Sequence, residues 1–526
     1  MKIKELINQA QARWPGKPES NLDLVHNIGE FQSEPRQVPE VCDWLFNELG
    51  YHFAGLVVEE GAEQWDIWYI FVGEADAGRI QVRTSALLEE RSFQSISRVV
   101  HAADWHERVV EDLFGLVFEG HPELGDFILH DDVWGEGVEP MRKSFDASRP
   151  IANRKPRHDW RPRRIVEAPG AFIMPIGPVY SGEAESVHFQ LETIGEEVIS
   201  AFARLFFKYR GLEKIAEGRS VDDVLLLAER FAATTAFSHG LAFCEAVEQI
   251  GMAKVPERAQ YLRVFLAELE RFRHHLGVIA GVCNSTGLAV ADSQAAILEE
   301  EALRLSGKLT GHRYLFGLVV PGGLSCDLSD EACREAAHQA QTILQRLNEL
   351  EQMLKFSNSF LDRIEEVGFI TTAQARSHGL VGPVGRGSGY CYDLRRMQPY
   401  SAYNRFDFDL PCEQEGDGYA RLRVWFAEAR QSVRIMEQVA RQLPGGAIYA
   451  PCEKTPGVAL SGVETPRGAT YHWVRIGEKG KITRYRPITP SCSNWHGFHL
   501  AAENFAFQDF PIILATFGLS VAENDR

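Results

Sequence analysis

Five long stretches of this 526-residue chain place apolar residues three and four positions apart over several turns. This spacing predicts amphipathic helices. The stretches are 196–216, 221–251, 257–284, 331–367 and 419–442. Long helices bury their apolar faces against one another, so we expect the region 165–526 to be mainly a helical bundle.

Residues 1–142 show a different pattern, in which one amphipathic helix at 41–53 is followed by runs typical of strands. These strand-like runs are 53–60, 65–74 and 79–89, and shorter ones follow within the helical region at 171–180, 187–198 and 467–487. The expected fold class is therefore α+β, with a small N-terminal α/β domain before a mainly α-helical bundle domain that carries small β-elements.

The segment 143–164 is predicted to link these two domains. Together with Arg142 it holds nine Lys and Arg but two Asp, and Pro150, Pro156 and Pro162 prevent a helix. Two interpretations stay open: a solvated extended connector, or a strap that lies on an acidic partner face.

The net charge and the hydropathy exclude several classes of protein. With 55 Lys and Arg against 73 Asp and Glu, the formal net charge of −18 repels nucleic acid phosphates, so we expect no nucleic acid partner. No run approaches the roughly 18–20 apolar residues that cross a bilayer, and the first residues lack the apolar core of a signal peptide. Membrane association is expected to be peripheral, through partner subunits.

The nine cysteines are scattered along the chain, and no two of them form a Cys-x-x-Cys pair. In a large chain this usage predicts reduced cytosolic thiols.

The common catalytic motifs are incomplete in this chain. His106 begins a zinc-protease-like pattern, but Val110 stands where the second histidine belongs. The glycine-rich segment 382–390 lacks the Gly-Lys-Ser/Thr of a phosphate loop. Three further histidines on helical segments are expected to be hydrogen-bonded core residues rather than ligands: His239, His274 and His275.

Two sets of motifs are more specific. The first comprises WHERVVEDLFG at 105–115, FEGHP at 118–122 and PMRK at 140–143, and it resembles the small hydrophilic subunit of respiratory complex I. The second resembles the quinone-site subunit of complex I, which is related to the large subunit of membrane-bound, energy-converting NiFe hydrogenases of the hydrogenase-4 and formate hydrogenlyase type. Its pieces lie at 176–178, 209–214, 227–230, 238–239, 244–248, 382–389, 392–395, 399–400 and 464–468. The resemblance implies a natural fusion of the two subunits.

The hydrogenase relationship implies four thiolate ligands in two Cys-x-x-Cys pairs, because soft sulfur ligands hold nickel and iron. Here the matching positions are Ala232 and Thr235 in the first pair, and Ser520 and Glu523 in the second. We therefore expect vestigial ligand positions, no NiFe centre and no cofactor bound by this chain.

The complex I resemblance implies a quinone headgroup bound by a His and a Tyr, and an Asp on a later helix that is the partner of the His. Tyr180, Val221 and Ser285 stand at these three positions, so the usual quinone site is expected to be dismantled. The remaining polar candidates fit either structural ion pairs or a rewired proton or substrate site. They are Glu229, Arg230, His239, Arg467 and Glu523.

The resemblance implies a connector subunit at the cytoplasmic face of the inner membrane, not catalytic by itself. Its expected partners are a small iron–sulfur subunit that holds the nearest cluster and membrane-arm subunits that include antiporter-like proteins. A dehydrogenase module is a further candidate. The alternative is an active oxidoreductase subunit that reduces quinone or another small acceptor, with Tyr180 or His239 as proton donor.

Overall fold

The computed structural model describes residues 3–14, 20–23, 27–74, 77–130, 133–135, 137–148, 167–180 and 185–526. Helices make up 46% and strands 20% of the structure, which confirms the α+β class. Residues 149–164, most of the predicted basic linker, lie outside the described residues, so neither interpretation of the linker is tested. The boundaries at 142 and 165 also stay predictions.

The N-terminal region is built on a five-stranded sheet with the order β1-β2-β5-β4-β3, in which β2 and β5 are parallel and the other pairs are antiparallel. Its elements are α1 (Ile3–Arg13), β1 (Ser20–Asp23), β2 (Ile28–Gln32), α2 (Val38–Asp43), a π-helical turn (Trp44–Glu48), β3 (His52–Glu60), β4 (Gln64–Val72), β5 (Arg79–Leu87), β6 (Ser92–Gln94), a 3₁₀ turn (His101–Ala103), α3 (Asp104–Phe114) and β7 (Val117–Glu119). The three predicted strands are present. The helix predicted over 41–53 is confirmed as far as Glu48 and wrong beyond it, because His52 and Phe53 belong to β3.

Strand β4 shows why this sheet has two buried faces. Successive side chains of a strand point to opposite faces. Trp65 and Ile67 therefore face one apolar core, which holds the N-terminal helices and also residues of the later segments 188–204 and 490–517, while Trp68 and Ile70 join the core of the helix bundle. The sheet is the layer through which the two regions pack.

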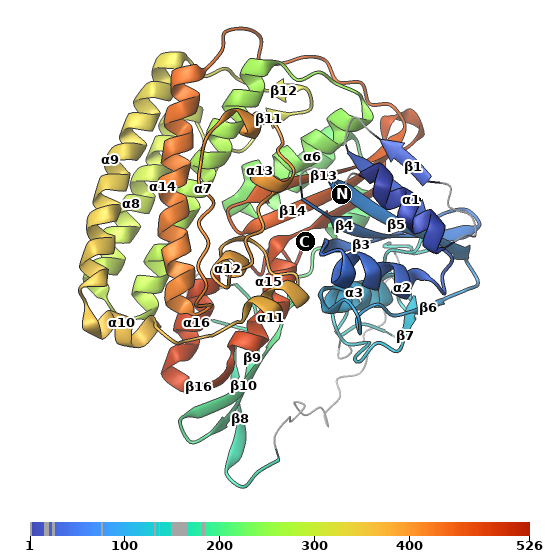
Figure 1. Ribbon diagram of the computed structural model, residues 1–526, viewed down its shortest axis with the longest axis horizontal. Coiled ribbons are helices and arrows are strands. Elements are labelled where there is room, and N and C mark those ends of the chain that lie inside the picture. The colour runs from blue at the N-terminus through green and yellow to red at the C-terminus, as the bar shows by residue number, and fades with distance from the viewer. Residues whose placement is uncertain are drawn as a thin grey trace.

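Four long helices form the bundle on the left of Figure 1: α7 (Glu257–Ser285), α8 (Ala289–Thr310), α9 (Asp330–Lys355) and α14 (Gly418–Gln442). Helix α7 is buried along most of its length because α8 and α14 pack against it. The sequence predicted α7, α9 and α14 but missed α8.

The remaining elements connect the bundle to the N-terminal sheet. Before α7 these are β8 (Ala171–Ile176), β9 (His188–Ile194), β10 (Glu197–Arg204), α4 (Leu212–Ala216), α5 (Val221–Arg230), a 3₁₀ turn (Ala233–Thr235) and α6 (Ala236–Ile250). Between α8 and α14 they are β11 (Val319–Val320), β12 (Gly323–Leu324), α10 (Asn358–Ile364), α11 (Thr372–Ser377), α12 (Gly382–Arg386), α13 (Leu394–Met397) and a 3₁₀ turn (Tyr403–Arg405). After α14 they are β13 (Gly457–Thr465), β14 (Gly468–Ile476), a 3₁₀ turn (Glu478–Gly480), β15 (Ile482–Ile488), α15 (Pro490–Ala501), β16 (Glu503–Ala506), a 3₁₀ turn (Phe507–Asp509) and α16 (Phe510–Phe517). Strands β8, β9, β10 and β16 form a sheet that projects at the bottom of Figure 1.

Three predicted helices are wrong in part, and one of them is the stretch 331–367, which is broken at 356–357 between α9 and α10. The stretch 196–216 begins with strand β10, which pairs with β9 on one side and β16 on the other, and ends with the short helix α4. The stretch 221–251 is broken at 231–235, where a 3₁₀ turn separates α5 from α6. This break brings Ala232 and Thr235 out of a regular helix. In the part of the chain that the structure describes, no helix is both long and apolar enough to cross a bilayer.

Candidate functional site

The positions matched to the two Cys-x-x-Cys pairs come together from opposite ends of the helical region. Ala232 and Thr235 lie at the turn between α5 and α6, and Ser520 and Glu523 lie after α16. All four residues are at most 4% exposed. Thr235 Oγ1 donates a hydrogen bond to Glu523 Oε1 at 3.1 Å, and the Glu523 amide donates to Ser520 Oγ at 3.3 Å.

The Glu523 carboxylate is the centre of this cluster. Arg467, from the turn between β13 and β14, places Nη1 3.2 Å from Oε1, and Ser491 Oγ donates to Oε2 at 2.5 Å. Burial raises the pKa of Glu523, but Arg467, His239 and Ser491 outweigh burial and hold the pKa at about 2. The group is therefore a carboxylate at neutral pH. We call Thr235, His239, Arg467, Ser491 and Glu523 the Glu523 cluster.

A chain of hydrogen-bonded rings leads away from Glu523. His239 Nε2 lies 3.5 Å from Glu523 Oε1, His239 Nδ1 lies 3.2 Å from His472 Nε2, and Tyr485 Oη lies 3.0 Å from His472 Nδ1. Burial lowers the pKa of His472 well below its usual value and raises that of Tyr485, so both are neutral. With His472 and Tyr485 neutral, the two hydrogen bonds are matched when Tyr485 donates to His472 Nδ1 and His472 Nε2 donates to His239 Nδ1. His239 Nε2 faces Glu523 Oε1 at 3.5 Å but makes no regular hydrogen bond among the described residues.

Three other predicted residues, Tyr180, Glu229 and Arg230, have their hydrogen-bond and ion-pair partners outside this cluster. Tyr180 Oη donates to the Val187 carbonyl at 2.7 Å, within the loop between β8 and β9. The buried Glu229 accepts from the Gly317 amide at 3.0 Å and pairs with Arg230 at 3.5 Å, and burial raises its pKa. His239 and Arg467 are thus the predicted candidates that the structure brings to Glu523.

The loop between β8 and β9 nevertheless reaches the C-terminal segment. Glu185 accepts hydrogen bonds from the backbone amides of Val521 at 2.5 Å and Ala522 at 3.1 Å. Its carboxylate also lies 3.4 Å from Ser520 Oγ. No sequence motif marked Glu185 as a site residue.

The other two positions matched to the quinone site have local structural roles. Val221 is the buried first residue of α5, where Ser220 and Asp223 form a capping box. Ser285, the last residue of α7, donates Oγ to the Val282 carbonyl at 2.8 Å.

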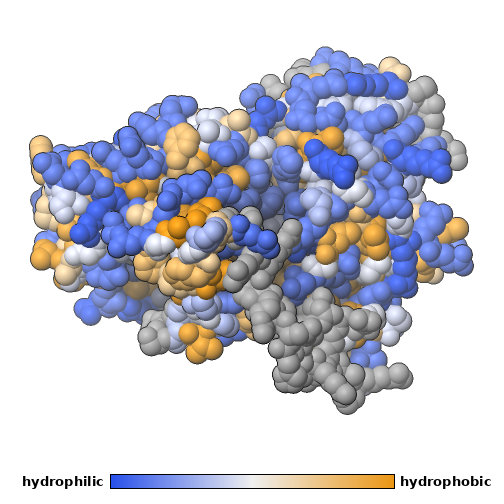
Figure 2. Space-filling view, turned by 90° about the horizontal axis from the view of Figure 1, so that it is seen from below, coloured by the Kyte–Doolittle hydropathy of each residue, from blue (hydrophilic) through white to orange (hydrophobic). Residues whose placement is uncertain are grey.

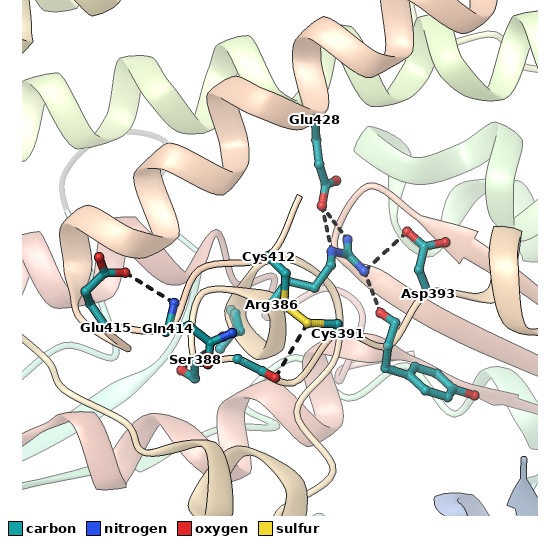
Figure 3. The surroundings of a disulfide bond; sticks show 11 residues. Arg386, Ser388, Cys391, Asp393, Cys412, Gln414, Glu415 and Glu428 are labelled. Atoms are coloured by element: carbon teal, nitrogen blue, oxygen red, sulfur yellow. Dashed lines mark hydrogen bonds and ion pairs between the residues drawn. A yellow bond between two sulfur atoms is a disulfide. The ribbon is translucent and has the colours of Figure 1, made fainter. Parts of the chain in front are cut away.

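A second buried polar cluster surrounds Arg386 and was missed as a site. Arg386 donates to Glu428 at 2.7 Å and to Glu464 at 3.0 Å, and His275 Nε2 lies 3.1 Å from Glu428 (Figure 3 shows the pair with Glu428). Burial, reinforced by the neighbouring Asp393, raises the pKa of Glu464 to about 7, although Arg386 opposes this. The motifs at 382–389, 392–395 and 464–468 supply most of these groups, so the matched motifs were the available signal.

The disulfide Cys391–Cys412 lies beside this cluster, as Figure 3 shows, and corrects the expectation that all thiols are reduced. It joins the loop before α13 to the loop before α14, 21 residues later. The two cysteines lie on loops that meet only in the folded chain. The sequence therefore contains no Cys-x-x-Cys pattern from which this disulfide could be predicted. The other seven cysteines are free.

The four positions matched to the Cys-x-x-Cys pairs offer a donor set that does not fit a NiFe centre. Ala232 offers a methyl group, Thr235 and Ser520 offer neutral hydroxyls, and the Glu523 carboxylate is already paired with Arg467. Nickel and iron in such centres need soft thiolates. Among the described residues no group of three His, Cys, Asp or Glu side chains is placed to hold a metal ion.

Three family models match successive parts of the chain. Residues 31–150 match the 30 Kd subunit of respiratory-chain NADH dehydrogenase, and residues 295–456 match its 49 Kd subunit. Residues 210–277 match the nickel-dependent hydrogenases. The match to the 30 Kd subunit precedes the match to the 49 Kd subunit along one chain, which agrees with a fusion of the two subunits.

Relatives and a solved structure agree with these matches. Formate hydrogenlyase subunit 5 of Escherichia coli is 29% identical over 93% of this chain and 87% of its own length. The fused C/D polypeptide of the NADH-quinone oxidoreductase of Bdellovibrio bacteriovorus is 30% identical over 81% and 77%, respectively. A chain of the archaeal membrane-bound sulfane sulfur reductase superposes with a TM-score of 0.64 at 27% identity and covers 68% of this chain and 99% of that one. The chain therefore belongs to the family of fused 30-kDa and 49-kDa complex I subunits, the NADH-quinone oxidoreductase C/D family, related to the large subunits of formate hydrogenlyase and hydrogenase-4, and it is a subunit of a complex I-like or hydrogenase-like respiratory complex.

Proposed function

We propose that this chain is a connector subunit that holds no NiFe centre, supports electron transfer through a partner iron–sulfur subunit and couples it to a membrane arm. The observation that carries the proposal is the Arg467–Glu523 ion pair, with 3.2 Å between Nη1 and Oε1. A cation at this distance neutralises the one charged oxygen donor among the four matched positions. The hydrogen-bonded, buried cluster suits a structural role better than metal binding.

The proposed partners are a small iron–sulfur subunit and membrane-arm subunits that include antiporter-like proteins, with a dehydrogenase module as a further candidate. The projecting sheet offers a surface for such contacts, because Phe172 and Phe202 are 49% and 44% exposed and Val179 in the next loop is 90% exposed. Seen from below, apolar residues gather near the middle of the molecule (Figure 2). Exposed apolar groups of this kind mark interaction surfaces. The proposed place is the cytoplasmic face of the inner membrane, reached through these partners.

Metal analysis of the intact complex tests the absence of a NiFe centre. The complex is purified through a tag on this chain, and nickel and iron are measured per chain. We expect iron from the partner's clusters and nickel far below one atom per chain. Nickel near one atom per chain, reduced by the substitution Glu523→Gln, would contradict the proposal.

A second candidate function is supported by the row of neighbouring side chains Glu523, His239, His472 and Tyr485. These groups can accept and donate protons, so they offer a path for a proton within the buried cluster. In this alternative the subunit reduces quinone, or another small acceptor, in a remodelled cleft. Quinone reduction by the intact complex is compared for His239→Gln, Tyr180→Phe and the exposed control His338→Gln. Loss of activity in either of the first two, with assembly and the control unchanged, would favour the alternative.

A further inference from the structure

The buried groups around Arg386 form a network of ion pairs with one more carboxyl group than it has arginines. Figure 3 shows Arg386 between Glu428 and Asp393. Each carboxyl group of the network lies no more than 3.0 Å from an arginine nitrogen, and no member is more than 1% exposed. We call this network the Arg386 cluster. Its arginines are Arg271, Arg386 and Arg395, and its carboxyl groups are those of Glu268, Asp393, Glu428 and Glu464.

The titratable neighbours that the structure describes do not balance the fourth carboxyl group. His275 on α7 lies 3.1 Å from Glu428, but burial lowers the pKa of its ring to about 4, so the ring is neutral at neutral pH. With all four carboxyl groups ionised, three positive charges would face four negative ones. A buried charge without a partner is costly, so the retention of one proton is favoured. Burial raises the pKa of the tyrosines beside the cluster, which are therefore neutral: Tyr392, Tyr400, Tyr403 and Tyr471.

Two further arginines approach from other elements but have contacts outside the cluster. Arg79 on β5 donates to the Leu460 carbonyl, four residues before Glu464 on β13 and so roughly 13 Å back along that strand. Arg467, in the turn after β13, is paired with Glu523. Neither arginine therefore supplies the missing positive charge.

Asp393 and Glu464 compete for one nitrogen of Arg386. Nη1 lies 3.0 Å from Glu464 Oε1 and 3.4 Å from Asp393 Oδ2. Glu428 does not compete for this atom, because it lies 2.7 Å from Nε and 2.6 Å from Nη2. Burial, followed by Asp393, raises the pKa of Glu464 to about 7, whereas Arg395 and Arg386 outweigh burial and lower the pKa of Asp393. A proton retained by the cluster therefore fits best between these two groups, mainly on Glu464.

A cavity gives this pair a route to solvent. Its volume is about 330 Å³, and Leu394, Pro399 and Tyr400 are among its wall residues. The Leu394 amide donates to Glu464 Oε2 at 3.0 Å, and Tyr400 Oη accepts from the Glu464 amide at 3.2 Å. Pro399 is exposed, so the same cavity reaches the surface. One water needs about 15 Å³, so the cavity has room for water beside the contacts of Glu464.

We propose that Asp393 and Glu464 form a proton-binding site, in which the two carboxyl groups share one proton that exchanges with water in the cavity. With the proton bound, three carboxylates balance three arginines. Release breaks one carboxyl O–H bond, passes the proton to water and leaves the cluster with one unbalanced negative charge. The pair is thus a buried acid and base that works near neutral pH, the range in which general acid–base groups are effective.

Infrared spectroscopy of the complete chain tests this proposal, because a protonated carboxyl group has a C=O stretching band that a carboxylate lacks. Spectra are compared between about pH 5.5 and about pH 8.5, where ordinary carboxyl groups stay ionised. The parent is expected to lose a band with a midpoint near pH 7 that is absent from Glu464→Gln and retained in the exposed control Glu63→Gln. The band should shift in heavy water, because the proton exchanges. Identical titrations of the parent and Glu464→Gln overturn the proposal, and so does a band that heavy water leaves in place.

Asp393→Asn distinguishes a shared proton from the effect of burial alone. The substitution keeps the helix cap, because Asp393 Oδ1 accepts from the Arg395 amide at 2.8 Å and asparagine is an equally good cap. Three carboxyl groups then face three arginines, so Glu464 is expected to be ionised and the band to be absent over the whole range. A band that persists in Asp393→Asn with a midpoint near pH 7 overturns the sharing. Circular dichroism checks the folding of both variants, and each variant tests the proposal independently of the other.

Discussion

Arg467 and Glu523 form a buried ion pair, in which the guanidinium Nη1 lies 3.2 Å from Oε1 and the carboxylate is fully buried. The pair links the turn between β13 and β14 to the C-terminal segment. Arg467 also donates Nε to the Gly518 carbonyl at 2.8 Å, so one side chain fixes two points of that segment.

Loss of Arg467 should be strongly destabilising. Arg467→Met leaves the Glu523 carboxylate buried without its cation, and removal of one partner from a buried pair costs about 3–5 kcal/mol. The midpoint of thermal unfolding is expected to fall clearly. The double variant Arg467→Met/Glu523→Met should recover part of the loss, because no charge then remains unpaired.

A matched control for this prediction is Arg346→Met, which breaks an exposed pair with Glu301. Exposed pairs contribute about 0–1 kcal/mol, so the midpoint should barely change. An equal effect of Arg346→Met and Arg467→Met would contradict the role given to burial.

Acid should destabilise the chain through its buried, paired carboxylates. The pKa of Glu213 and that of Glu523 are both held at about 2, against 4.5 for an ordinary glutamate, since buried arginines outweigh the burial that raises them. Each lowered pKa contributes stability that is fully present above about pH 4.5 and is lost as the pH falls toward 2. The contribution of one such group is about 3 kcal/mol.

The variant Glu213→Gln checks the acid effect directly. Glu213 pairs with Arg484 at 2.7 Å and with Arg486, so the variant should be less stable than the parent near neutral pH. The difference between the two should shrink as the pH falls from about 4.5 to 2, where the parent loses the same charge. A constant difference across this range would exclude the proposed protonation.

The sequence predicted the helices and strands that have a strong apolar periodicity. It predicted the wrong secondary structure where hydrogen bonds to residues far along the chain determine the conformation. Helix α7 and strands β3 to β5 follow from their own apolar spacing. By contrast, Glu197–Arg204 contains enough apolar residues to suit a helix, but β9 and β16 offer it hydrogen-bonding edges and it becomes β10. Tertiary pairing overrides local preference in such segments.

The candidate site was predictable in its residues but not in its contacts. The matched motifs named His239, Arg467 and Glu523, and the structure brings these three together. Their roles depend on His472 and Ser491, which no motif marked. Arg386 pairs with Glu464, which a motif marked, but also with Glu428, a residue 42 positions away on another helix that no motif marked. The sequence alone contains no signal for such a pairing.

Glu59 should be important for the packing of the N-terminal sheet on the helical region. Its carboxylate accepts hydrogen bonds from Trp473 Nε1 at 2.6 Å and from Arg475 Nε at 2.5 Å. Glu59→Ala leaves the indole N–H of the buried Trp473 without its acceptor, at a cost of about 1–3 kcal/mol. Limited proteolysis should be faster in this variant, whereas the exposed neighbour Glu63→Ala should behave like the parent.

The disulfide between Cys391 and Cys412 should be measurable by chemistry and by stability. Of nine cysteines, 9 − 2 = 7 are free, so the unreduced, denatured chain should react with seven equivalents of a thiol reagent, and nine after reduction. The double variant Cys391→Ser/Cys412→Ser removes a cross-link that closes a short loop, and we expect a loss of about 2–4 kcal/mol, seen as a lower thermal midpoint. A reductant should lower the midpoint of the parent toward that of the double variant and leave the double variant unchanged. Cys326→Ser, at an exposed free thiol, should match the parent. Nine reactive thiols without reduction would refute the cross-link.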